Sequence, residues 1–290
     1  MRANQGIGKE TAYQLSLRGA KIIIGCRDEL RAENAIKEIV SRNPNANIIH
    51  IKLDLSSLQS IRAFVQQIYE NETKIDLLIN NAGIGFTPEL KTADGFELAF
   101  GTNHLGHYLL TLQLLPLLRK APKARVVNVS SMAQAFGRIH FENINLRNGV
   151  YNQSDAYSQS KLANVLFTRE LAKRLGPDST VTAYALHPGA IQTEWYRNMN
   201  SRVAQAMARI MGRIVGLSVE RGCQTTLYCA LEESLDNESG FFYANCLRVH
   251  NMPTNSRDDK SAEQLWHLSA DLVQLEDHYK LTKHAWSTTA

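Results

Sequence analysis

Short apolar runs alternate with longer stretches of helical periodicity along the whole chain. The run KIIIG at residues 21–25 is one example, and the stretch that follows, residues 28–41, spaces its apolar side chains at helical intervals. A run of about five apolar residues is typical of a strand buried on both faces, whereas a half-exposed strand would alternate. The pattern predicts strands over residues 21–25, 47–53, 75–79, 125–129, 181–186 and 240–243.

The stretches between these strands predict helices with recognisable ends. Asp28 stands at the cap position of the second helix, and Ser56 and Ser57 precede the third. Gly176 and Pro177 form a stop signal after the helix that begins at residue 156. Helices are expected over residues 9–18, 28–41, 58–70, 96–119, 156–174 and 262–275, with two or three more within residues 194–233.

The alternation of strands and helices implies a parallel sheet covered on both faces. The chain has 290 residues without internal repeats or a low-complexity linker, a length that suits one large α/β domain. The sequence therefore predicts a single doubly wound, Rossmann-like α/β domain over residues 1–290.

Charge and cysteine content narrow the class of protein. The net charge of +4, from 32 basic and 28 acidic residues, is too small to indicate a nucleic-acid partner. Four cysteines without paired spacing indicate the reduced thiols of an intracellular protein. The sequence has no run of 18 apolar residues and no signal peptide, so the chain as given is not expected to span a membrane.

Three features are compatible with a bound dinucleotide, and each has an ordinary structural alternative. Gly6-Ile7-Gly8 precedes a predicted helix and would let backbone N–H groups approach a pyrophosphate, although alone it is more typical of a simple turn. Arg27 follows the strand at 21–25, where a guanidinium would suit a ribose 2′-phosphate, but a surface arginine is an equal alternative. Asp54 could accept a hydrogen bond from an adenine amino group or cap the next helix.

The pattern Tyr157-Ser-Gln-Ser-Lys161 carries the candidate chemistry. Residues four apart share a helix face, and an ammonium beside a phenol is expected to lower the pKa of that phenol toward neutrality. Such a phenol can give or take a proton while a hydride moves to or from a carbonyl carbon. Ser131, after the strand at 125–129, could donate to a substrate oxygen, and Asn103 could disturb its helix and hold a water.

A similar pair, Tyr279 and Lys283, lies in a polar tail without a nearby strand end and is read as a chance match. His104 and His107 are three residues apart, but no carboxylate or cysteine joins them at ligand spacing. Packed or solvated histidines are therefore expected, and no metal site.

Taken together, these residues resemble the short-chain dehydrogenase/reductase family. The order of the family is matched by Asn80-Asn81-Ala82-Gly83, Asn103, Ser131, Tyr157-x-x-x-Lys161 and His187-Pro188-Gly189. The stretches at 91–97 (KTADGFE), 103–107 (NHLGH) and 160–174 look more narrowly like the retinol dehydrogenase branch.

The resemblance implies roles for these residues. Tyr157 would be the general acid/base, Lys161 would hold the nicotinamide ribose and tune Tyr157, Ser131 would orient the substrate oxygen, and Asn103 would hold a relay water. Thr193 would bind the cofactor carboxamide. The cofactor-binding set implied is Asn4, Gly6, Ile7, Gly8, Arg27, Asp54, Asn81, Ala82, Gly83, Tyr157, Lys161, Pro188, Gly189 and Thr193.

The same resemblance implies the cofactor, substrate and setting. Arg27 then favours NADP(H) over NAD(H), and the substrate would be an apolar alcohol, aldehyde or ketone such as retinol or retinal. Residues 194–219, rich in Met and aromatic side chains, would form a substrate lid. The family suggests a homodimer, and the branch often carries an apolar N-terminal anchor. The expected location is the cytoplasm or an intracellular membrane such as the endoplasmic reticulum.

The chain departs from the family at its start. In the family, the pattern Thr-Gly-x-x-x-Gly-x-Gly follows the first strand. When this pattern is aligned with the chain, its Thr falls on Met1 and its first Gly on Arg2, so the first strand is expected to be missing by truncation. Strand one lies in the middle of such a sheet, and the strands at 21–25 and 75–79 would lose the partner that joins them. A catalytically defective nucleotide-binding or protein-interaction form is therefore the alternative to an active enzyme.

Overall fold

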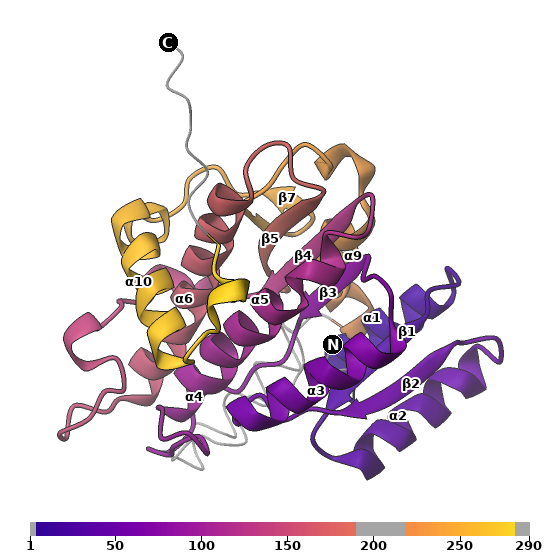
Figure 1. Ribbon diagram of the computed structural model, residues 1–290, viewed down its shortest axis with the longest axis horizontal. Helices are drawn as coiled ribbons and strands as arrows, with labels where there is room; N and C mark the ends of the chain where they lie inside the picture. Colours follow the sequence, from indigo (N-terminus) through magenta and orange to yellow (C-terminus); the bar gives the residue numbers. More distant parts are fainter. Residues whose placement is uncertain (1–3, 190–217, 282–290) are drawn as a thin grey trace.

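The central sheet falls into two parts in the computed structural model, which describes residues 4–189 and 218–281 (Figure 1). The smaller part pairs β1 (Ile22–Cys26) with β2 (Ile48–Lys52). The larger part has the order β3-β4-β5-β6-β7, in which only β7 runs antiparallel. Its strands are β3 (Leu77–Asn80), β4 (Ala124–Val129), β5 (Val181–His187), β6 (Phe241–Ala244) and β7 (Leu247–Arg248).

The break in the sheet lies between β1 and β3. Among the described residues no strand is paired between them, which agrees with the expectation for residues 21–25 and 75–79. Their side chains nevertheless share one buried cluster, which contains Ile24 of β1, Ile79 of β3 and Val127 of β4. Apolar packing therefore joins the two parts of the sheet where strand pairing does not.

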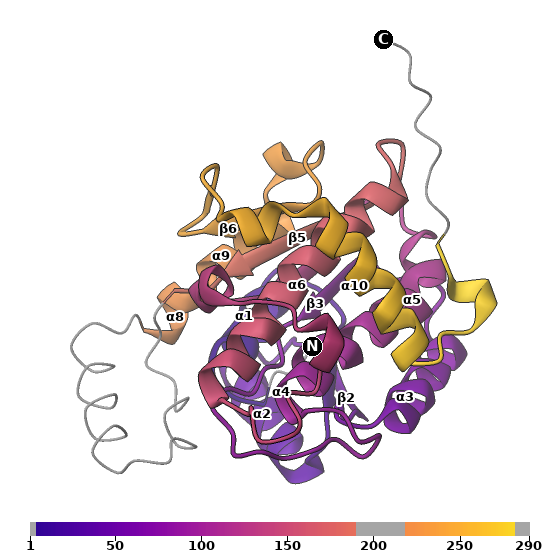
Figure 2. The same ribbon diagram turned by 90° about the vertical axis from the view of Figure 1, so that its left-hand side faces the viewer.

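Helices cover both faces of the sheet, as the doubly wound prediction requires (Figure 1, Figure 2). Successive residues of β4 point to opposite faces, so Val126 lies in one buried cluster and Val127 in the other. The Val126 face is covered by α3 (Leu58–Asn71), α5 (Gly106–Leu118), α6 (Gln153–Leu175) and α10 (Asp259–Leu272). The Val127 face is covered by α1 (Gly6–Ser16), α2 (Glu29–Arg42) and α9 (Gln224–Leu231), and α8 (Val219–Gly222) contacts α1 and α9.

The helix ends follow the polar signals in the sequence. The Asp28 carboxylate accepts a hydrogen bond from the backbone N–H of Arg31 and caps α2, and the Ser57 hydroxyl caps α3. Gly176 ends α6 with a φ of +78°, a conformation that favours glycine. These caps confirm the predicted starts of α2 and α3 and the predicted end of α6.

The helix expected over residues 96–119 is interrupted by a wider turn. It begins as α4 (Leu98–Phe100), continues as a π-helical turn over Gly101–Leu105, and then becomes α5. A Cβ on Gly106 would lie 2.5 Å from the carbonyl oxygen of Leu55, so glycine lets the start of α5 approach the loop after β2. The π turn contains Asn103, the residue expected to disturb this helix.

Several predictions fall outside the described residues. These are Thr193, residues 194–217 of the expected lid and Lys283, whereas residues 218 and 219 lead into α8. All four cysteines are free, as their spacing indicates. Short 3-10 helices lie at Met132–Phe136, Phe141–Asn143, Glu233–Leu235, Thr254–Arg257 and Asp277–Tyr279.

Candidate active site

The first candidate element is the turn that opens α1. Gly6 has a φ of +57° and begins the helix, directly after Gln5 in extended conformation. The first N–H groups of a helix have no partner within it and attract negative charge. This end of α1 can therefore hold a phosphate group.

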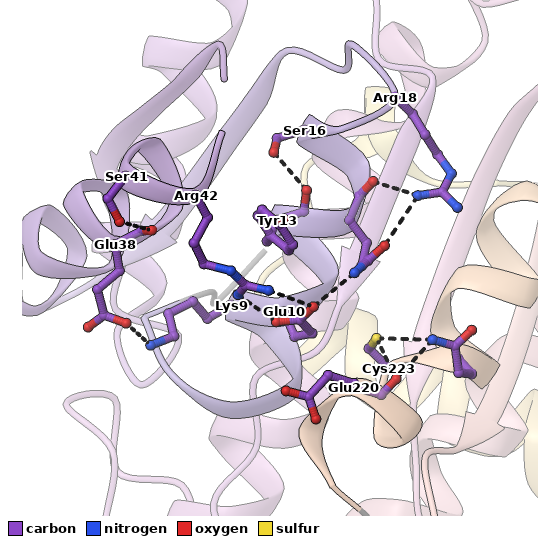
Figure 3. A network of polar contacts seen from close by, with 12 residues as sticks. Lys9, Glu10, Tyr13, Ser16, Arg18, Glu38, Ser41, Arg42, Glu220 and Cys223 are labelled. Carbon is purple, nitrogen blue, oxygen red and sulfur yellow. Dashed lines mark hydrogen bonds and ion pairs between the residues drawn. The ribbon is translucent and has the colours of Figure 1, made fainter. Parts of the chain in front are cut away.

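A polar network fixes α1 against the end of α2 (Figure 3). The Glu10 carboxylate is buried on α1 and forms an ion pair with Arg42, with 2.9 Å between Oε2 and Nη1. The Arg42 guanidinium also lies 3.5 Å from the centre of the Tyr13 ring, and Glu10 raises the pKa of Arg42. Lys9 forms a second ion pair with Glu38 of α2. The network sets the direction in which the start of α1 points.

The candidates after β1 and β2 lie at the carboxyl ends of these strands. Arg27 is exposed directly after β1, and Asp28 next to it is occupied as the cap of α2. Asp54 follows β2, and its Oδ1 accepts hydrogen bonds from the backbone N and the hydroxyl of Ser56 at 2.9 and 2.6 Å. These bonds close a turn before α3, so the prediction that Asp54 caps this helix is wrong: the cap is Ser57.

Asn103 joins three elements through its side chain. Its Oδ1 accepts a hydrogen bond from the Ile84 N–H at 2.8 Å, and its Nδ2 donates to the Ile84 carbonyl at 2.8 Å and to the Ser160 hydroxyl at 2.9 Å. The Ser160 hydroxyl donates in turn to the Tyr157 carbonyl at 2.7 Å. The π turn, the loop after β3 and helix α6 are thus held together at one buried amide.

Helix α6 places Tyr157 and Lys161 on one face, as the spacing predicts. The Lys161 side chain is buried, with the whole residue only 4% exposed, and its Nζ donates to the Val129 carbonyl at 3.1 Å. Nζ lies 5.7 Å from the centre of the Tyr157 ring. The Ser131 hydroxyl, which follows β4, acts on the Tyr157 phenol and lowers its pKa. The structure therefore brings Ser131, Tyr157, Lys161 and Asn103 to one region.

The expected effect of Lys161 on the phenol is wrong for this structure. The pKa of Tyr157 is raised above its ordinary value of 10 because burial disfavours the phenolate, and the hydrogen bond from Ser131 opposes this only in part. Burial also lowers the pKa of Lys161 to about 8. The prediction from the sequence considered only the charge of Lys161, whereas burial has the largest effect on the pKa of both side chains.

The two histidines of the π turn region are packed, which was one of the two expected states. The His104 Nε2 is 2.8 Å from the Ser269 hydroxyl, and the His107 Nδ1 donates to the Asn103 carbonyl at 2.9 Å. Burial lowers the pKa of each to about 3, so both rings are neutral at pH 7. Within the described ranges, no group of three or more His, Cys, Asp and Glu residues could hold a metal ion.

The remaining cofactor candidates surround the ends of β3 and β5. These strands flank β4, so the loops at residues 81–83 and 188–189 leave the same edge of the sheet. A Cβ on Gly83 would lie 3.1 Å from Lys161 Nζ and 3.8 Å from Asn103 Oδ1. Gly189 has a φ of +92°. Asn4 and Ile7 lie at the opening of α1.

This arrangement fits a nicotinamide dinucleotide. Gly83 has no side chain where a Cβ would approach Lys161, so a ribose could reach the ammonium there. The start of α1 suits the pyrophosphate, and exposed Arg27 lies directly after β1 at its carboxyl end.

Sequence reasoning missed three contributors to this site. Ser160 and the Val129 carbonyl hold Asn103 and Lys161, and the Phe86 ring packs against Tyr157 with 5.2 Å between ring centres. Ser160 lies within the quoted Tyr157–Lys161 pattern, and its position next to Lys161 was the available signal. No sequence signal identified Phe86.

Comparisons with known proteins identify the family of this chain. The family model for short chain dehydrogenases matches residues 2–204. The chain is 46% identical to mouse retinol dehydrogenase 12, over 94% of this chain and 85% of that protein, and 44% identical to human retinol dehydrogenase 11, over 94% and 84%. A solved structure of an uncharacterized protein from Mycobacterium paratuberculosis is 37% identical and covers 94% of this chain and 91% of its own, with a TM-score of 0.73.

The chain therefore belongs to the short-chain dehydrogenase/reductase family, a class of oxidoreductases that use a nicotinamide cofactor. Within the family it is retinol dehydrogenase-like and acts on a small molecule at an alcohol or carbonyl group.

Because burial disfavours the Lys161 ammonium, removing this charge should stabilise the folded, cofactor-free protein. The ordinary pKa of 10.5 and the lowered value of about 8 differ by an amount equivalent to about 3 kcal/mol. Below pH 8 the folded state carries this full penalty, and it disappears as the pH rises from 8 to about 10.5, where both states become neutral. Lys161→Met should therefore raise the free energy of unfolding of the cofactor-free protein at pH 7, by up to about 3 kcal/mol.

Denaturant titrations at pH 7 and pH 10 measure this difference. The Val129 carbonyl keeps Asn164 as a donor in the variant, at 3.3 Å, so no new unsatisfied group is created. Lys120→Met, at an exposed position, is the control and should leave stability unchanged. A Lys161→Met protein that is less stable than wild type at pH 7 would contradict the electrostatic account.

Proposed function

We propose that this chain catalyses the NADP(H)-dependent interconversion of an apolar alcohol and its aldehyde or ketone, with Tyr157 as general acid/base. One observation carries the proposal: the Tyr157 phenol interacts with the Ser131 hydroxyl, and the buried Lys161 ammonium lies next to Gly83 and 5.7 Å from the centre of the Tyr157 ring. The names of the related retinol dehydrogenases support an apolar, retinol-like substrate.

Each residue of the site has its own role in the proposed reaction. A nicotinamide cofactor bound here would supply a hydride to the carbonyl carbon in reduction and would accept one in oxidation. Tyr157 is protonated at neutral pH because burial raises its pKa, so in reduction its phenol donates a proton to the carbonyl oxygen. The Ser131 hydroxyl orients that oxygen by a further hydrogen bond. The Lys161 ammonium, which lies next to Gly83, would hold the cofactor ribose.

Asn103 has a positioning role in this proposal. Its amide is already used by Ile84 and Ser160, so it holds the cofactor loop next to the helix that carries Tyr157.

The wider setting is also part of the proposal. A homodimer and membrane attachment through an N-terminal segment follow from the family resemblance, as does an intracellular location. None of the helices in residues 4–189 and 218–281 is long and apolar enough to cross a bilayer.

Replacing the phenol tests the proposed mechanism. Tyr157→Phe removes the proton donor but keeps the ring, so the rate of retinal reduction with NADPH should fall about 100-fold or more, with the Kd for NADPH within about twofold. NADPH absorbance measures the rate and calorimetry measures binding. Tyr279→Phe is the control, because Tyr279 lies in the 3-10 helix Asp277–Tyr279 and packs against the apolar cluster on the Val126 face, and it should retain full activity.

Two other outcomes of these measurements would count against the proposed mechanism or in favour of its alternative. Activity that survives Tyr157→Phe unchanged would contradict the mechanism. A wild-type chain that binds NADPH without turnover would favour the alternative, a catalytically defective nucleotide-binding or interaction form, for which the two-part sheet is the supporting observation.

Arg27 tests the preference for NADP(H). A charged hydrogen bond to phosphate contributes about 1.5–3 kcal/mol, so Arg27→Ala should weaken NADPH binding by roughly 10- to 100-fold and leave NADH binding unchanged. Arg31→Ala is the matched control, because Arg31 is also exposed on this segment but forms an ion pair with Asp28. Equal loss of both cofactors in Arg27→Ala would overturn the assignment.

A further inference from the structure

The loop after β3 lies directly on the catalytic tyrosine. A Cβ on Gly85 would be 3.3 Å from Cε2 of Tyr157, so the backbone passes close to one edge of the ring. The next residue, Phe86, places its ring centre 5.2 Å from that of Tyr157, with 34° between the ring planes. An aromatic side chain therefore stands beside the group that handles the proton.

Phe86 occupies an unfavourable backbone conformation. Its φ is +43°, in the left-handed region that bulky side chains rarely adopt, at a cost of about 1–3 kcal/mol. Such strain persists only where the surroundings impose it, and it is concentrated at functional sites.

Contacts on both sides of Phe86 impose this conformation. Before it, the Asn103 amide holds the Ile84 backbone with two hydrogen bonds of 2.8 Å. After it, the Tyr151 hydroxyl donates to the Thr87 carbonyl at 2.8 Å and also contacts the Pro88 carbonyl at 3.2 Å. The loop is therefore fixed at two points, and the Phe86 ring is held between them.

Core packing does not account for this placement. Phe86 is only half-buried and is not part of any of the three apolar clusters formed by the described residues. A second apolar side chain, Met132, follows Ser131 directly and is 49% exposed. Apolar groups thus lie next to both polar residues that would contact the substrate oxygen.

We propose that Phe86 forms an apolar wall of the substrate site and selects long apolar carbonyl compounds over short ones. The inference rests on the proposed function and names the residue that sets its substrate class. The strained backbone presents the ring along the path by which a substrate chain would leave Tyr157, so a long substrate gains contact that a short one cannot make.

The test compares two aldehydes in the presence of saturating NADPH. For Phe86→Ala, we expect kcat/KM for retinal to fall about tenfold or more, while kcat/KM for propanal stays within about twofold. Phe86→Leu should lose less with retinal, because it keeps part of the apolar surface. Phe136→Ala is the matched control, since this phenylalanine is 86% exposed near Ser131 and should change neither value.

Three results would overturn the inference or separate it from the proposed function. An equal fall with both aldehydes would mean that Phe86 only supports the Tyr157 ring, and unchanged values with both would mean that it does not contact substrate.

If wild type turns over neither aldehyde, the proposed function fails, and retinal binding by tryptophan fluorescence quenching still tests Phe86. A raised Kd for retinal in Phe86→Ala would then support the wall, and an unchanged Kd would refute it.

Discussion

A buried ammonium is the constraint on which the site depends. Lys161 is carried into the interior by α6, where burial lowers its pKa to about 8, and its Nζ is held by the Val129 carbonyl at the end of β4. A buried charge is unfavourable without compensation, so the fold has to bring polar groups to it. The absence of a side chain at Gly83 leaves space beside this ammonium, and that space is where the cofactor ribose would bind.

The other unusual features of the fold converge on the same region. The π turn presents Asn103, whose amide connects the loop after β3 to α6, and the strained Phe86 lies on that loop. A π turn, a left-handed aromatic residue and a buried lysine each disfavour the folded state. Destabilising features of this kind are concentrated at active sites, where they place the groups that take part in the reaction.

Much of this could be predicted from the sequence because local rules decide it. Buried strands read as short apolar runs, Asp28 and Ser57 cap the helices that follow them, and a spacing of four puts Tyr157 and Lys161 on one face. The break between β1 and β3 was expected from the family resemblance and not from a local rule. The pKa of Tyr157 and the φ of Phe86 could not be predicted, because they depend on burial and on contacts from distant segments.

The most direct measurement is the ionisation of Tyr157 in the cofactor-free protein. Ultraviolet titration of phenolate absorbance in wild type and in Tyr157→Phe isolates this residue by difference. Because desolvation outweighs the hydrogen bond from Ser131, the account predicts that the difference signal appears only above pH 10. A difference signal that appears near pH 7 would contradict it, since Tyr157 would then be an anion before any cofactor binds.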